Sequence, residues 1–147
     1  MTKLSPHFTL EELTHSDTAV RLRISNLPPP RELARLTETA KAMEAVRSLL
    51  GVSINVSSGY RGVELNRAVK GATASAHCLG YAVDFNCPGL TPYEVCRKIL
   101  GSKIVFDQLI HEYGRWTHIS FDPRMRRMPL SIFDPQRRYL NGILPKP

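Results

Sequence analysis

One long amphipathic helix is the strongest constraint on how this chain can fold. From residue 31 to residue 50, apolar residues recur at steps of three and four positions, and charged residues fill the other faces. This pattern is typical of a helix with one buried side. Prolines precede the segment, and Gly51 follows it where a left-handed C-terminal cap belongs. We expect the apolar face to pack against a sheet. Its members are Leu33, Leu36, Ala40, Met43, Val46 and Leu50.

Four short segments have the composition of the strands that such a sheet requires. Residues 52–57 alternate apolar and polar side chains, and residues 82–85 form a second apolar-rich run. Residues 106–112 and 116–121 flank the tripeptide Tyr113-Gly114-Arg115, which predicts a hairpin. Together with the long helix, these strands predict the α+β class, with a small antiparallel β-sheet and helices packed against it.

Shorter helices are marked by their start signals. Thr9 and Glu12 have the spacing of a capping box, as do Thr91 and Glu94, where Pro92 occupies the first helical position. The second of these helices is expected to run to residue 100. A further short helix is predicted over residues 63–69.

The chain is expected to form a single domain over residues 1–147. Residues 1–30 form an N-terminal lead-in, which is loose after its first short helix. Residues 122–147 contain several prolines, and we expect them to be an irregular C-terminal segment that wraps the domain.

Charge and hydropathy limit the possible partners. The net charge of +7 favours polyanions. The basic residues are densest near the C-terminus, at Arg124, Arg126, Arg127, Arg137 and Arg138. No motif predicts specific nucleic-acid binding. No apolar run approaches the roughly 18 residues of a transmembrane segment, and the N-terminus lacks the apolar stretch of a signal peptide. We therefore expect synthesis in the cytoplasm. The protein is also expected to be a monomer.

The three cysteines do not indicate a structural role. Cys78, Cys87 and Cys96 are odd in number and contain no Cys-x-x-Cys pair. This argues against a disulfide framework and against a thiolate zinc site. A cysteine nucleophile stays open as an alternative.

The candidate metal site consists of His77, Asp84 and His118. Asp84 lies between two apolar residues on a predicted strand, where a carboxylate is costly to bury unless it is paired or bound to a metal. Two imidazoles and one carboxylate with a water molecule form a common catalytic zinc arrangement. The alternatives are a hydrogen-bonded core histidine at position 118, and an aspartate that caps a helix or pairs with an arginine.

The hairpin predicts a general base beside this site. A three-residue loop places Glu112 opposite Trp116 and Ile110 opposite His118, so Glu112 and His118 share one face as diagonal neighbours. Zinc lowers the pKa of water toward ~7, and a nearby carboxylate can accept the proton. Asp107 is expected on the opposite face. Glu112 could also be a solvated residue at the end of a hairpin.

Several motifs resemble those of the zinc D-alanyl-D-alanine carboxypeptidase family, which also contains phage endolysins and L-alanyl-D-glutamate endopeptidases. The resemblance covers roughly residues 4–121. It rests on Ser-Gly-Tyr-Arg at 58–61, on Ser-x-His-x-x-Gly-x-Ala-x-Asp at 75–84, on the hairpin at 106–120, and on a lead-in at 4–13 that is similar to that of short, often phage-encoded members.

The resemblance implies a role for each matching residue. His77, Asp84 and His118 would be the zinc ligands. Arg61 would hold the substrate and polarise the scissile carbonyl, as its planar fork suits an oxyanion or carboxylate. Minor contacts are expected from Ser75 and Gln108. Many relatives carry the catalytic acid three residues before the last histidine, where this chain has Arg115. Glu112, six residues before, matches the shorter members.

The expected function is a zinc-dependent peptidoglycan peptidase that hydrolyses an amide bond in the stem peptide or crosslink of the cell wall. A phage or prophage endolysin, with L-alanyl-D-glutamate or DD-endopeptidase activity, would act on the wall from the periplasm or the exterior. The alternatives are a D-alanyl-D-alanine carboxypeptidase and a non-catalytic zinc-binding structural module.

Overall fold

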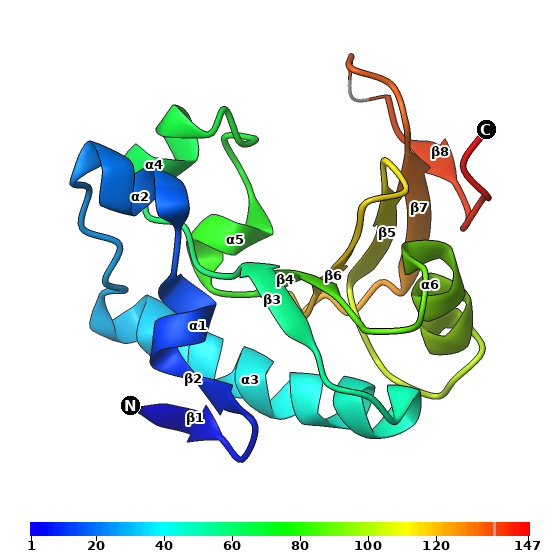
Figure 1. The fold of residues 1–147 in the computed structure, drawn as a ribbon, viewed down its shortest axis with the longest axis horizontal. Coiled ribbons are helices and arrows are strands. Elements are labelled where there is room, and N and C mark those ends of the chain that lie inside the picture. The colour runs from blue at the N-terminus through cyan, green and yellow to red at the C-terminus, as the bar shows by residue number, and fades with distance from the viewer. Residues whose placement is uncertain (137) are drawn as a thin grey trace.

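A computed structural model describes residues 1–136 and 138–147, so Arg137 of the basic segment lies outside the described residues. The described chain contains a two-stranded antiparallel sheet and a six-stranded sheet with the order β3-β4-β6-β5-β7-β8 (Figure 1). Helices accompany both sheets, which confirms the α+β class. The strands are β1 (Lys3–Ser5), β2 (Phe8–Thr9), β3 (Asn55–Ser58), β4 (Ala82–Asn86), β5 (Gln108–Glu112), β6 (Trp116–Ser120), β7 (Met128–Ile132) and β8 (Leu140–Asn141).

The long helix is present as predicted. Helix α3 (Pro30–Leu50) ends at Gly51, whose φ of 70° confirms the left-handed cap. It runs along one side of the six-stranded sheet, and α6 (Pro92–Leu100) lies beside the same sheet (Figure 1). Both helices contribute to the main core, with five of the predicted apolar positions of α3 buried: Leu36, Ala40, Met43, Val46 and Leu50. No helix in the described residues has the length and apolar character needed to cross a membrane.

The central strands sort their side chains into two faces. Val83 of β4 pairs with Ile119 of β6, which pairs in turn with Leu109 of β5, and all three belong to the core packed on the helices. The next row consists of Asp84, His118 and Ile110. Because successive side chains point to opposite faces, this row faces away from the core.

The predicted caps are also present. Capping boxes open α1 (Leu10–Thr14), with Thr9 and Glu12, and α6, with Thr91 and Glu94. The short helix predicted near residue 63 is α4 (Val63–Ala68).

Two further helices were missed. The stretch expected to be loose contains α2 (Asp17–Leu22), which is capped by the Ser16 hydroxyl and ends at Arg23 in the left-handed conformation. The other is α5 (Ala76–Leu79), which carries His77.

The expectation of an irregular C-terminal segment was wrong. Strand β7 pairs in parallel with β5, and β8 pairs with β7, so the larger sheet is mixed rather than wholly antiparallel. Pro129 lies within β7 without cost to the β5 ladder. The Met128 N–H donates to the Asp107 carbonyl at 2.8 Å, on the β5 side of the strand. The backbone N–H groups of successive residues in a strand point toward opposite neighbouring strands. The nitrogen of Pro129 therefore faces the outer side, where the two-residue β8 pairs with Leu130 and Ser131 only.

Candidate active site

His77 is positioned by a short helix and a tight backbone approach. The Ser75 hydroxyl caps α5 by accepting the His77 N–H at 3.2 Å. The imidazole Nδ1 lies 2.7 Å from the Gly59 carbonyl oxygen, which can only accept, so Nδ1 carries the proton. A Cβ at position 59 would collide with the Leu13 carbonyl. Glycine in the Ser-Gly-Tyr-Arg motif thus lets the carbonyl that orients His77 lie where it does.

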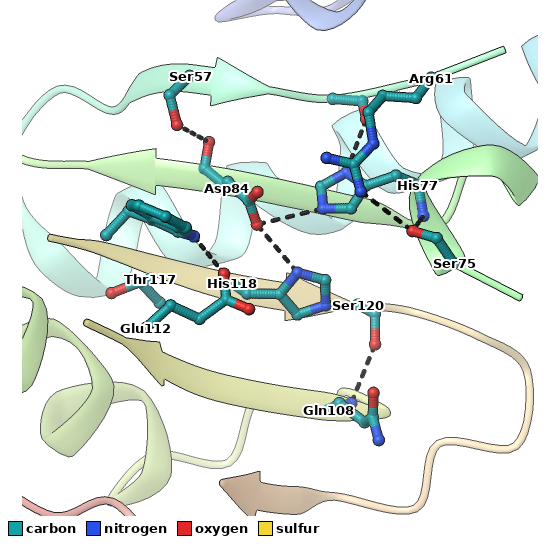
Figure 2. Close-up of polar contacts among 12 residues, drawn as sticks. Ser57, Arg61, Ser75, His77, Asp84, Gln108, Glu112, Thr117, His118 and Ser120 are labelled. Carbon is teal, nitrogen blue, oxygen red and sulfur yellow. Dashed lines mark hydrogen bonds and ion pairs between the residues drawn. The ribbon is translucent and has the colours of Figure 1, made fainter. Parts of the chain in front are cut away.

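Asp84 and His118 come together through strand pairing. They are directly opposite each other on β4 and β6, and one carboxylate oxygen of Asp84 lies 2.9 Å from His118 Nδ1 and 3.2 Å from His77 Nε2 (Figure 2). The two imidazole rings meet edge to face with centroids 5.1 Å apart. The three residues are buried and offer ligand atoms that all lie within 4.8 Å of one another.

This donor set fits a divalent cation such as zinc. The proton on His77 Nδ1 leaves Nε2 with a lone pair directed at the Asp84 carboxylate, so two acceptors face each other inside the protein. Such an arrangement is unfavourable unless a proton or a cation lies between them. Imidazole nitrogen and carboxylate oxygen are both zinc ligands, and Gly59 fixes the orientation of one of them from behind.

The protein's own charges favour an ionised carboxylate at the centre of this cluster. Burial alone would raise the pKa of Asp84, but the charges and hydrogen bonds of His77 and His118 outweigh it and hold the pKa well below its usual range. Burial lowers the pKa of His77. Burial acts in the same direction on His118, but its hydrogen bond to Asp84 and the charge of that carboxylate raise its pKa overall.

Glu112 lies on the same face as His118. The register confirms the expected hairpin, with Glu112 opposite Trp116 and Ile110 opposite His118. The Glu112 carboxylate accepts a hydrogen bond from the indole N–H of Trp116 and lines the pocket beside the histidines (Figure 2). Burial, with a further contribution from the negative charge of Asp84, raises the pKa of Glu112. The Trp116 contact holds the carboxylate in place.

The remaining predicted site residues border the same pocket, which has a volume of about 420 Å³. Arg61 donates to the Ser75 hydroxyl at 3.2 Å, and its buried Nε has no hydrogen-bond partner among the described residues. Gln108 lines the opposite part of the pocket, and its backbone N–H donates to Ser120. Ser75 is thus both a helix cap and the residue that holds Arg61.

Two other acids are paired with arginines, and burial raises the pKa of all three cysteine thiols, Cys78 included. Asp107 is buried and paired with Arg126 at 2.8 Å, which explains why it does not face the pocket. Asp122 pairs with Arg124 at 3.0 Å. Burial raises the pKa of Cys87 to about 11 and that of Cys96 to about 12, so neither thiol supplies a nucleophilic thiolate near neutral pH.

Comparison with known proteins fits this arrangement. The model of the family described as Peptidase M15 matches residues 6–120. The chain belongs to the peptidase M15 family. This confirms the resemblance to the zinc D-alanyl-D-alanine carboxypeptidases, and the protein is therefore a peptidase and a hydrolase. None of the curated proteins matches the chain.

Part of the pocket lies outside the region that matches the peptidase M15 family. Ile132, at the end of β7, and Tyr139, just before β8, both line the pocket. Sequence reasoning missed them, because residues 122–147 were expected to be irregular. The alternation of Leu130 and Ile132 is a strand signal, but it spans too few residues to outweigh the prolines on either side.

Proposed function

We propose that the protein is a zinc-dependent endopeptidase that hydrolyses an amide bond in the stem peptide or crosslink of bacterial peptidoglycan. The observation that carries this proposal is the convergence of His77, Asp84 and His118 in one pocket with Glu112 and Arg61. A metal-binding group alone would also suit a structural module. A buried carboxylate and a guanidinium beside it are what a hydrolytic site requires.

In this proposal His77, Asp84 and His118 would hold a zinc ion. A zinc ion supplies Lewis acidity and lowers the pKa of water toward ~7. Glu112 then accepts the proton of the attacking water and passes it to the leaving amine. Its raised pKa suits both steps, because general acid–base catalysis works best when the pKa lies near the operating pH. The indole N–H of Trp116 keeps the carboxylate oriented between the two transfers.

Arg61 is the second catalytic group that we propose. Its guanidinium is held by Ser75 on the wall opposite Gln108, with Nε buried and without a partner in the described part of the chain. The guanidinium lines the pocket, so its terminal N–H groups can meet a substrate carbonyl and would stabilise the oxyanion that develops during hydrolysis. Gln108 and Ser75 would contribute polar contacts that orient the peptide.

Pockets on two sides of the site favour an endopeptidase over a carboxypeptidase. One, of about 300 Å³, shares Arg61 and Val69 with the metal pocket. The other, of about 390 Å³, shares Tyr113 and Trp116 with it. An endopeptidase must accommodate several residues on both sides of the scissile bond, whereas a carboxypeptidase needs room for a single residue beyond it.

We further propose that the enzyme is a lytic protein of a phage or prophage and acts on the wall from the periplasm or the exterior. Support comes from the lead-in at residues 4–13, which is similar to that of short phage-encoded members, and from the net charge of +7. A basic protein meets anionic envelope polymers more often. We also propose that the protein acts as a monomer.

Digestion of purified peptidoglycan tests the proposal. Zinc-loaded wild type is expected to release soluble fragments with new amino termini, which mass spectrometry assigns to one bond. Glu112→Gln serves as the matched inactive control. Release of D-alanine alone would instead identify a carboxypeptidase. Release of neither soluble fragments nor D-alanine by the zinc-loaded protein would reject a peptidoglycan peptidase.

A further inference from the structure

A second pocket lies at the tip of the β5–β6 hairpin. It has a volume of about 390 Å³ and is lined by Tyr113, Arg115, Trp116, Phe133, Pro135 and Lys146. Three of these come from the hairpin and three from the C-terminal segment, so both parts of the chain build the pocket. Half of its lining therefore lies beyond the region that matches the peptidase M15 family.

Two exposed cations border this pocket without a counter-charge. Arg115 and Lys146 form no ion pair with any residue in the described ranges, unlike Arg124, Arg126 and Arg138, which all pair with aspartates. Asp134, which lies between two lining residues, is held by Arg138 at 2.9 Å. Two unpaired cations at one pocket favour an anionic ligand.

The side chain of Lys146 lies against the turn of the hairpin. Gly114 has a φ of 65°, and a Cβ there would lie 2.6 Å from Cδ of Lys146. The absence of a side chain at position 114 thus lets the aliphatic part of Lys146 lie directly on the turn. This places the ammonium group on the same tip as the guanidinium of Arg115, the next residue of the turn.

The other walls of the pocket are aromatic. The rings of Tyr113 and Trp116 have centroids 5.7 Å apart, and Phe133 also lines the pocket. All three are half-buried. Such surfaces take up methylene groups and the flat faces of amide bonds, while the cations take up a charge.

The second pocket adjoins the metal pocket. Tyr113 and Trp116 line both, and the indole N–H of Trp116 bonds to Glu112. A ligand bound at the hairpin tip therefore lies against the same indole that orients the proposed general base. An extended peptide could thus pass from one pocket into the other along Trp116.

We infer that the hairpin-tip pocket is a substrate subsite that binds a free carboxylate of the peptide being cut, held between Arg115 and Lys146. The inference rests on the proposed peptidase function, and it names acidic peptides as the preferred substrate class. It also gives Arg115 a role in specificity at the position where many relatives carry an acid.

The test compares two synthetic stem peptides that differ only in whether their side carboxylates are free or amidated. Binding is measured by calorimetry in the slow Glu112→Gln background, and hydrolysis is measured separately with an intact Glu112. We expect the free-acid peptide to bind about tenfold or more tightly than the amide, as is typical of paired charge-assisted hydrogen bonds. Arg115→Gln with Lys146→Gln should abolish this preference, so that the free-acid and the amidated peptide bind alike.

The control removes two exposed cations that line none of the pockets described, in Arg97→Gln with Lys103→Gln. This control variant should still bind the free-acid peptide more tightly than the amidated one. Arg115→Lys should retain part of that preference. Equal binding of the two peptides, or a preference that survives in the Arg115/Lys146 double variant, would overturn the inference even if both peptides are hydrolysed. Carboxylate-dependent binding without hydrolysis would support the subsite and reject the proposed peptidase function.

Discussion

Buried and half-buried carboxylates meet different partners in two regions of this sheet. In the pocket, Asp84 faces two histidines and Glu112 faces an indole N–H. At the C-terminal edge, by which we mean the place where the segment between β6 and β7 meets the start of β5, Asp107 and Asp122 face arginines. An arginine keeps its proton at any pH that the fold survives, so it neutralises its partner permanently. Histidine and indole leave the carboxylate able to bind a cation or accept a proton.

The comparison teaches that burial of an acid does not by itself identify a functional site. Asp107 is as well buried as Asp84, with relative exposures of 2% and 7%. What separates them is the partner. Arg126 binds Asp107 with two side-chain bonds and one backbone N–H, which ties the start of β7 to β5. We therefore expect substitutions in the pocket to change activity, and substitutions at the edge to change stability.

The largest effect is expected for Glu112→Gln. The amide keeps the shape and can still accept the Trp116 N–H, but it cannot take a proton, so kcat should fall by about a hundredfold or more. Zinc content should stay unchanged.

The pH dependence of Glu112→Gln sharpens the test. Burial raises the pKa of Glu112, and the base must be ionised to work. Wild-type activity should therefore fall as the pH drops through this raised pKa, above the ~4.3 of an exposed glutamate. The variant should lack that acidic limb. A turnover number within a few-fold of wild type would remove Glu112 from the proton transfer.

Asp84→Asn should have the next largest effect. It removes the negative charge between the two histidines, and zinc affinity should fall by about tenfold or more. Competition with a chromogenic chelator measures this change. Asp107→Asn is the matched control, and it should bind zinc as wild type does. Equal affinities in both variants would show that the pocket and the edge do not differ in the way proposed.

Asp107→Asn should instead lower the free energy of unfolding by about 1–3 kcal/mol, because it weakens bonds to a charged partner. The hydrogen bond from Arg126 lowers the pKa of Asp107 in the folded state. The stabilisation is thus present above the unfolded pKa of about 4 and is lost as the pH falls through the folded value. Urea titrations at several pH values should show the gap between variant and wild type closing in acid.

The smallest effect is expected for Arg124→Gln. Arg124 is 63% exposed, and exposed ion pairs contribute about 0–1 kcal/mol. If Arg124→Gln lowered the free energy of unfolding as much as Asp107→Asn, exposure would not determine how much each ion pair at this edge stabilises the fold.

The sequence predicted the pocket well where local rules decide the geometry. The tripeptide 113–115 sets the hairpin register, and the register places Glu112 beside His118. Capping residues fixed the starts of α1 and α6. The cluster needed only one non-local pairing, that of Asp84 with His118, and the family-like motifs implied it.

The C-terminal edge could not be predicted because long-range contacts decide it. Strand β7 contains Pro129, which is tolerated only because of the side on which β5 happens to lie. Arg126 and Arg127 suggested a polyanion-binding surface. In the structure Arg126 pairs with Asp107, and Arg127 donates to the carbonyls of Leu100, the last residue of α6, and Ser102. No local pattern in the sequence shows either partner.

Zinc titration of chelator-stripped protein tests the central claim most directly. The account predicts a single zinc ion bound per chain, with hydrolysis of cell-wall peptide restored in proportion to the zinc bound. His118→Ala should lose both the site and the activity while keeping its fold by circular dichroism. Full zinc occupancy and wild-type activity in His118→Ala would contradict the account.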